Sequence, residues 1–119
     1  MSAFEVWADP GFQRDLAGLH AADQAAVQGA LAGLAAHPRD HPQTVRLKGS
    51  DFPGSFRLRV GRLRLLGLAL DRPRVILLTT VFVKKRESDY DQALQRHEAR
   101  LKAQGPPLGD FVKSAKGGR

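Results

Sequence analysis

Apolar and polar residues alternate along residues 55–66, and this alternation is the clearest pattern in the chain. Successive side chains of a β-strand point to opposite faces of the sheet, so one face of this segment is apolar and the other is cationic. The two sets are Phe56, Leu58, Val60, Leu63 and Leu65 against Arg57, Arg59, Arg62 and Arg64. Gly61 lies between the two runs and predicts a hairpin. An even number of loop residues would place Arg57 opposite Arg64 and Arg59 opposite Arg62.

The residues before this hairpin predict a short strand and then a helix. Residues 4–8 alternate as in a strand, and Trp7 is expected in the core. Asp9 and Pro10 follow as an N-cap and a proline at the first helical position, so a helix is expected to begin there.

A second helix is expected directly after the first. Asp23 is predicted to cap it, and it ends near His37 because Pro38 disfavours helical backbone in the residue before it. We expect the two helices to form a helical hairpin. Residues 38–54 hold three of the seven prolines and are predicted to be a loop or an irregular edge.

The residues after the arginine-rich hairpin predict one more strand and one more helix. Residues 75–83 are apolar on both faces and rich in β-branched types, which favours a central strand that is covered on both sides. Ser88 or Asp89 can cap a final helix. The expected fold class is therefore α+β: an N-terminal strand, a helical hairpin, an antiparallel three-stranded run and a C-terminal helix.

Length and charge limit the possible functions. A chain of 119 residues is expected to form one domain. Its formal net charge is +7, but residues 1–43 carry only two arginines against five carboxylates, a net of −3, so the remainder carries +10. This asymmetry favours a basic surface for nucleic acid or an acidic protein partner.

Several classes of chemistry and location are disfavoured by what the sequence lacks. It contains no cysteine, which excludes disulfides, thiolate metal sites and a cysteine nucleophile. His37 and His41 have no further clustered ligands, so no metal and no cofactor is expected. The first ten residues do not resemble a signal peptide, and no apolar run is long enough to span a bilayer. A cytoplasmic protein is expected.

The row of arginines on one face of the predicted hairpin has two possible explanations. Like charges paired across strands destabilise a sheet, and solvent often screens them on the wet face of an antiparallel sheet. The alternative is that the guanidinium groups hold a phosphate anion. Tyr90 shares a helical spacing with Leu94, His97 and Leu101, which by itself favours packing.

Four local motifs resemble those of the RelE/ParE superfamily of bacterial toxins. Residues 45–49 look like its leucine, basic residue and glycine signature, and the arginine hairpin resembles the RelE pattern of alternating basic and apolar residues around a turn. Residues 85–90, followed by Ala93, resemble the Lys-Arg-Glu, Tyr and Ala pattern that ends RelE, and residues 82–85 look like the related HigB branch. The resemblance implies a toxin domain over residues 1–104 and leaves residues 105–119 as a basic flexible tail.

RelE-like toxins are ribosome-dependent endoribonucleases that cut mRNA without a metal. Carried over by position, the resemblance places Arg57 and Arg59 in proton transfer and charge stabilisation and Arg64 on the scissile phosphate. It places Arg86 or Lys85 at the leaving group and Tyr90 on the nucleotide. RNA or ribosome contacts are expected from further basic residues, namely Arg46, Lys48, Arg62 and Lys84.

The proton transfers are harder to assign than the phosphate contacts. An arginine has a pKa above about 12 and is a poor base, so Arg57 and Arg59 are expected to bind and polarise the substrate rather than abstract a proton. Lys85, Tyr90 or His97 could assist the transfers.

The resemblance also implies partners and competing functions. The partners would be a cognate antitoxin, in a hetero-oligomer, together with the ribosome and mRNA, and no membrane is expected. One alternative is a ParE-like protein that inhibits DNA gyrase without catalysis. The other is an inactive relative that only binds RNA or an antitoxin, which the replacement of the family's lysines by Arg57 and Arg59 keeps open.

Overall fold

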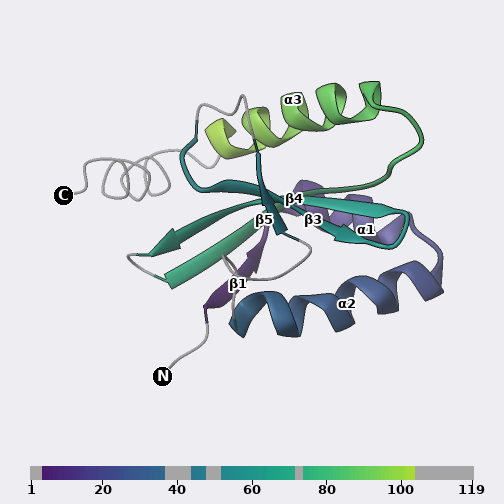
Figure 1. Cartoon of the computed structure of the whole chain (residues 1–119), viewed down its shortest axis with the longest axis horizontal. Helices are drawn as coiled ribbons and strands as arrows, with labels where there is room; N and C mark the ends of the chain where they lie inside the picture. Colours follow the sequence, from purple (N-terminus) through teal and green to yellow (C-terminus); the bar gives the residue numbers. More distant parts are fainter. Residues whose placement is uncertain (1–3, 37–43, 48–51, 72–73, 104–119) are drawn as a thin grey trace.

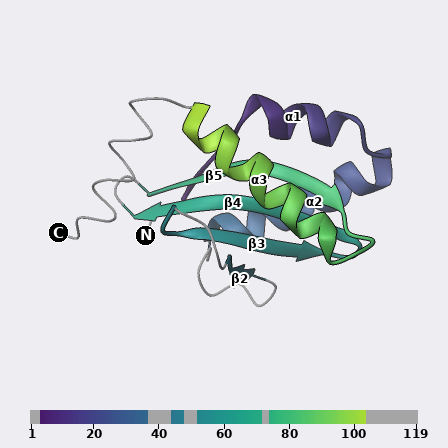
Figure 2. The same cartoon turned by 90° about the horizontal axis from the view of Figure 1, so that it is seen from above.

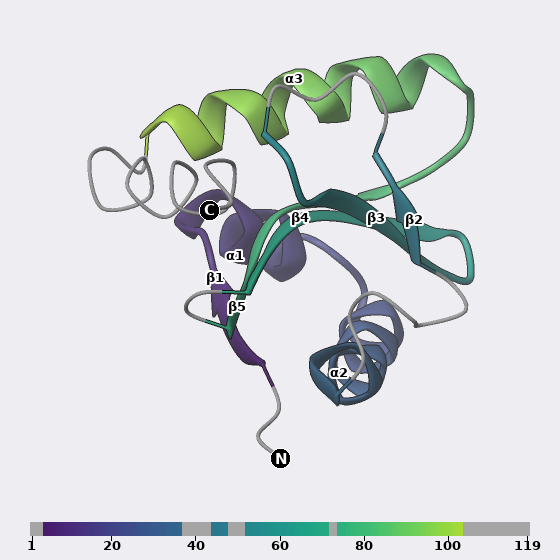
Figure 3. The ribbon, with the colours of Figure 1, turned by 60° about the vertical axis from the view of Figure 1, so that its left-hand side comes forward.

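The computed structural model describes residues 4–36, 44–47, 52–71 and 74–103, and within them the chain forms a five-stranded mixed sheet between two helical layers (Figure 1). The elements in chain order are β1 (Glu5–Ala8), α1 (Pro10–Ala17), α2 (Ala21–Ala36), β2 (Thr44–Arg46), β3 (Ser55–Val60), β4 (Leu63–Asp71), β5 (Arg74–Val83) and α3 (Ser88–Ala103). Helices α1 and α2 lie on one side of the sheet and α3 on the other (Figure 3). The predicted α+β class and the order of its main elements are confirmed. The predicted basic tail, residues 105–119, lies outside the described residues.

The strand order in the sheet is β1-β5-β4-β3-β2. Strand β1 pairs with β5 in parallel, and the remaining pairs are antiparallel. Strand β2 was not predicted as such, because residues 38–54 were expected to form a loop or an irregular edge. Its three residues include the β-branched Thr44 and Val45 and form the outer edge, where Val45 pairs with Arg57. Viewed from above, α3 lies across β4 and β5 (Figure 2).

The hairpin of β3 and β4 turns at Gly61 and Arg62, one residue later than the predicted pairing requires. Gly61 has a φ of 58°, in the left-handed region that glycine reaches without strain. Arg59 therefore faces Arg64, whereas Arg57 faces Leu66, so the predicted pairs of Arg57 with Arg64 and of Arg59 with Arg62 are wrong. The turn also removes Arg62 from the strand face.

The start of α1 is as predicted, but that of α2 is not. Asp9 accepts a hydrogen bond from the backbone N–H of Gly11 at 2.7 Å, and Pro10 is the first helical residue. Helix α2 begins at Ala21, so Asp23 lies inside its first turn and is not the cap. The Asp23 carboxylate instead forms an ion pair with Arg62 at 2.7 Å.

Both faces of the sheet bury apolar side chains against helices. On the side of α1 and α2 the core contains Phe12, Val27, Leu34, Phe56, Leu58, Leu63, Leu65, Ala69, Ile76, Leu78 and Val81. On the side of α3 the buried side chains are Leu66, Leu68, Leu70, Leu77, Phe82, Ala93 and Leu101. Trp7 is 41% exposed, so its predicted place in the core is wrong. Glu5 and Trp7 occupy the exposed side of the edge strand β1, while Val6 and Ala8 pack toward the helices.

Strand β5 contains a bulge that changes which of its residues face α3. Leu66 pairs with Thr80 and Gly67 pairs with Leu78, which leaves Thr79 as the extra residue. A Cβ on Gly67 would lie 2.8 Å from the carbonyl oxygen of Leu77, so this position requires glycine. Two adjacent threonine side chains, Thr79 and Thr80, consequently meet α3.

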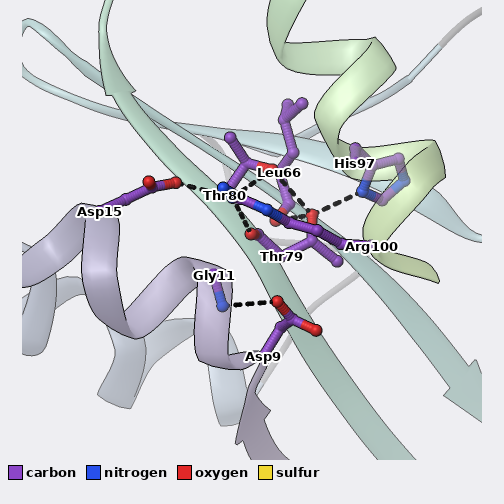
Figure 4. A network of polar contacts seen from close by, with 8 residues as sticks. All are labelled: Asp9, Gly11, Asp15, Leu66, Thr79, Thr80, His97 and Arg100. Carbon is purple, nitrogen blue, oxygen red and sulfur yellow. Dashed lines mark hydrogen bonds and ion pairs between the residues drawn. The ribbon is translucent and has the colours of Figure 1, made fainter. Parts of the chain in front are cut away.

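Polar side chains of α3 bind this bulge (Figure 4). The His97 ring is fully buried, with Nδ1 at 2.7 Å from the Thr79 hydroxyl and Nε2 at 2.9 Å from the Ser55 hydroxyl. Arg100 donates to Asp15 of α1 and to the Thr79 carbonyl oxygen, both at 2.7 Å. These contacts hold α3, β5 and α1 together. No described helix is long and apolar enough to cross a bilayer.

Burial lowers the pKa of His97 from 6.5 to about 4, although the charge of Glu98 partly opposes this shift. The unfolded chain takes up this proton near pH 6.5 and the folded protein only near pH 4. The contribution of the neutral His97 ring to the free energy of unfolding is thus fully present above pH 6.5 and is lost as the pH falls toward 4. We expect the free energy of unfolding to fall by about 3 kcal/mol over this range because of His97.

Urea unfolding of wild type and His97→Gln at several pH values checks this expectation. The variant should be less stable at pH 7 and should depend less on pH between 6.5 and 4.5. His20→Gln is the matched control, because His20 is exposed, and it should behave as wild type. Equal pH dependence in all three proteins would contradict the assignment to His97.

Candidate functional site: a cationic hollow beside Tyr90

Cations from two strands and one loop converge on Tyr90 at the start of α3. Arg57 and Arg59 lie on the face of β3 that looks toward α3, because they alternate with the buried Phe56 and Leu58. Arg64 of β4 is directly opposite Arg59. The convergence predicted from the sequence therefore holds for three of the four arginines.

Tyr90 contacts three cations, two through its ring and one through its hydroxyl. Its ring packs edge-on against Phe82 with centroids 5.7 Å apart, which fixes the ring. The Arg57 guanidinium carbon lies 4.8 Å from the ring centroid and the Lys84 ammonium lies 5.6 Å from it. Arg64 Nε donates to the Tyr90 hydroxyl at 2.9 Å. Cation–π contacts of this kind contribute about 0.5–2 kcal/mol each, and here they also set where the charges lie.

Arg64 is the most constrained of these cations. Besides its bond to Tyr90, its Nη1 donates to the carbonyl oxygens of Gly61 and Leu63, both at 2.8 Å. These three bonds use one donor on Nε and two on Nη1, and no hydrogen bond to another described residue uses the two donors of Nη2, which can therefore serve a ligand. Arg59, in contrast, is exposed and forms no ion pair with any described residue.

Two neighbouring hollows lie around Tyr90. The cationic hollow, of about 300 Å³, is lined by Val45, Arg57, Arg59, Arg64, Lys84, Glu87 and Tyr90. The apolar hollow, of about 480 Å³, is lined by Val45, Arg46, Leu47, Arg57, Glu87, Tyr90, Asp91 and Leu94. They share Val45, Arg57, Glu87 and Tyr90, so they lie next to each other between β2, β3 and the start of α3. Volumes of this size match those of sites for small ligands or single nucleotides.

Glu87 brings a carboxylate into the cationic hollow, and the candidate residues chosen from the sequence did not include it. Its Oε1 lies 2.7 Å from the Lys84 ammonium. The hydrogen bond and charge of Lys84, with smaller contributions from Arg57 and Arg64, lower the pKa of Glu87 below 4.5. Glu87 is therefore ionised at neutral pH. A carboxylate directly after three consecutive basic residues was the available signal in the sequence.

Lys85 and Arg86 are not part of either hollow, although both were predicted as site residues. They are exposed in the connection between β5 and α3. Their backbone N–H groups donate to Asp89 Oδ2 at 2.8 and 2.9 Å, and these bonds lower the pKa of Asp89 below 3.8. Asp89 thus folds this connection into a turn. Lys84, which was predicted only as an RNA contact, is the basic residue of the segment that lines the cationic hollow.

Of the remaining basic residues that were predicted to contact RNA or the ribosome, one lies at the site. Arg46 lines the apolar hollow. Arg62 lies in the hairpin turn and is held by Asp23, while Lys48 lies outside the described residues. No group of three His, Asp or Glu side chains that could hold a metal occurs in the described ranges.

The geometry of the site favours binding of a phosphodiester. Guanidinium groups offer paired donors that match phosphate oxygens, and three of them surround one small hollow. The adjoining hollow has Leu47 and Leu94 in its walls, which suits the flat face of a base or a sugar. Phosphate and base can thus be held side by side.

Known proteins are similar to this chain in structure rather than in sequence. No protein-family model matches the sequence, and no curated protein is significantly similar to it. A chain of the RelBE2 toxin–antitoxin complex from Mycobacterium tuberculosis is 26% identical, with a TM-score of 0.61 over 71% of this chain and 94% of that one.

Two further solved structures have the same fold at lower identity. The isolated RelE toxin of E. coli is 19% identical, with a TM-score of 0.61 over 79% of this chain and 98% of its own. A chain of the archaeal RelE–RelB complex from Pyrococcus horikoshii is 17% identical, with a TM-score of 0.62 over 71% and 98%. The chain therefore has the fold of RelE toxins, and these structural neighbours support a relationship to the RelE/ParE-like toxin superfamily.

Proposed function

We propose that this protein is the toxin of a toxin–antitoxin pair and that it cleaves mRNA on the ribosome without a metal. The observation that carries the proposal is the convergence of Arg57, Arg59, Arg64 and Lys84 on one hollow beside Tyr90. The likeness to RelE toxins supports a toxin. The cytoplasm, where ribosomes and mRNA are found, is the location that this function requires.

The arrangement suits cleavage of RNA by its own 2′-hydroxyl. In that reaction negative charge grows on the phosphorane, and cations already in place stabilise it without reorganisation. Arg64 is the best candidate for this role, because three hydrogen bonds fix its guanidinium while two donors remain. Arg57 and Arg59 add charge on the same face. Each such donor typically lowers the activation free energy by about 3–4 kcal/mol.

The proposed partner of the toxin is an acidic antitoxin. Several neighbours were solved as complexes of toxin and antitoxin. A partner that covers the cationic hollow would need carboxylates to offset its charge, since four cations line it. Binding there would exclude RNA and explain inhibition by simple competition.

Replacing the cations should slow cleavage strongly. We expect Arg64→Ala to lower the rate of mRNA cleavage about 10²- to 10³-fold, because it removes the fixed donor from the developing charge. Arg59→Ala should also lower the rate, and its exposed side chain makes a loss of folding improbable as an explanation. Cleavage is measured by primer extension on mRNA in a translation reaction.

Arg14→Ala is the control for the lost positive charge, since Arg14 is exposed on α1 at the opposite side of the sheet. It should cleave as wild type. Thermal unfolding of each variant checks the fold. Wild-type cleavage by a folded Arg64→Ala protein would contradict the proposed role.

RNA binding should weaken steeply with salt. For single-stranded RNA, the logarithm of the affinity falls with the logarithm of the salt concentration by about 0.7 for each phosphate contact. We expect Arg57→Ala to reduce this slope by about 0.7, whereas Arg14→Ala should leave it unchanged. Fluorescence anisotropy of a labelled RNA over a range of KCl concentrations gives the slopes. A slope near zero for wild type would exclude phosphate contacts in the hollow.

The two competing functions are separated by one additional assay. A supercoiling reaction with DNA gyrase, run in parallel with primer extension, tests the ParE-like alternative. Inhibition of gyrase without mRNA cleavage would assign the protein to that alternative. RNA or antitoxin binding with neither activity would indicate an inactive relative.

A further inference from the structure

The cationic hollow needs a proton acceptor, and its cations cannot supply one. Removal of the 2′-hydroxyl proton requires a group with a free lone pair near neutral pH. Guanidinium and ammonium groups have none. Among the described residues that line this hollow, Glu87 is the one carboxylate.

We propose that the Glu87 carboxylate takes the 2′-hydroxyl proton during RNA cleavage, an inference that rests on the proposed function. The 2′ oxygen then attacks phosphorus, and the bond from phosphorus to the 5′ oxygen breaks. The 5′ oxygen takes a proton from the Lys84 ammonium. After the products leave, Glu87 returns its proton to Lys84 across their contact of 2.7 Å. The products are a 2′,3′-cyclic phosphate and a 5′-hydroxyl, and no proton is gained or lost.

The neighbouring carboxylates are not placed for this task. Asp89 is occupied with the backbone N–H groups of Lys85 and Arg86. Asp91 lines the apolar hollow but not the cationic one. Glu87 lies in both, so it faces the position where a phosphate and its ribose would meet.

The contact of Glu87 with Lys84 in the free protein is compatible with this role. The Glu87 side chain is 83% exposed, so it can move toward a bound ribose without breaking the core. A bound phosphate competes with Glu87 for Lys84 and would free the carboxylate. A surface ion pair of this kind contributes little to stability, which makes the exchange easy.

Glu87→Gln tests the inference, because its two possible roles predict opposite results. If Glu87 only neutralised Lys84, its removal would leave the hollow more positive, and RNA would bind more tightly and be cut at least as fast. If it is the base, single-turnover cleavage should fall about 10²- to 10⁴-fold while RNA binds as tightly as to wild type or more tightly. The cleavage rate and the binding affinity are both measured on ribosomes that carry one defined mRNA, with the protein in excess.

Glu5→Gln is the matched control, since it makes the same substitution at an exposed position of β1 that lines neither hollow. Its cleavage rate should stay within about threefold of wild type, a margin far below the effect of losing a general base. If wild type cleaves mRNA and the Glu87→Gln protein cleaves it equally fast or faster, the role of Glu87 is overturned and the nuclease proposal stays intact. Equal losses in the two variants also overturn it, because the effect would then be one of charge. Absence of cleavage by wild type overturns the nuclease proposal and this inference together.

Discussion

The position of α3 on the sheet determines whether a site exists, and a bulge in β5 determines the position of α3. The extra residue Thr79 presents its hydroxyl and its carbonyl oxygen to His97 and Arg100. Tyr90 precedes His97 by seven residues, about two helical turns, on the same face of the helix. Once His97 is bound to the bulge and Leu101 is buried, Tyr90 has to lie over the ends of β3 and β4. Without the bulge, α3 would lose this register and Tyr90 would not meet the arginines.

Four cations in one small hollow repel one another, and the protein offsets that repulsion in three ways. The Tyr90 ring attracts Arg57 and Lys84, backbone carbonyl oxygens of the hairpin turn accept from Arg64, and the Glu87 carboxylate pairs with Lys84. Each contact is weak at a surface, where water screens charge. Together they hold the charges close without any buried ion. The remaining positive field makes this the expected place for an anionic ligand.

Similarity in fold and similarity in the chemistry of the site support different conclusions about this protein. The toxin fold is shared with chains that are 17–26% identical, over nearly the whole of their lengths. A fold by itself does not imply an activity, which depends on the groups placed on it. Among the described residues, the cationic hollow combines three arginines and Lys84 with one carboxylate, Glu87, whereas a site of cations alone has no proton acceptor. In the proposed mechanism, this proton acceptor is the group that would separate a nuclease from a protein that only binds its ligand.

Local pattern alone determined most of the secondary structure. Alternation in residues 55–66 and the apolar run of residues 75–83 predict strands, and Asp9 with Pro10 predicts the start of α1, because these signals act between neighbours in the chain. The short edge strand β2 was not predicted, because its three residues acquire strand structure only by pairing with β3. Trp7 is exposed for a similar reason, because its burial depends on what covers the edge of the sheet.

The site was only partly determined by the sequence. Alternation places Arg57, Arg59 and Arg64 on one face, and the helical spacing places Tyr90 with His97. Tertiary structure alone decided that the turn at Gly61 diverts Arg62 to Asp23, and that Lys84 rather than Lys85 or Arg86 joins Tyr90. It also brought Glu87 to the arginines. These outcomes depend on hairpin register and on the docking of α3, which are set by contacts between residues far apart in the chain, and no local pattern encodes such distances.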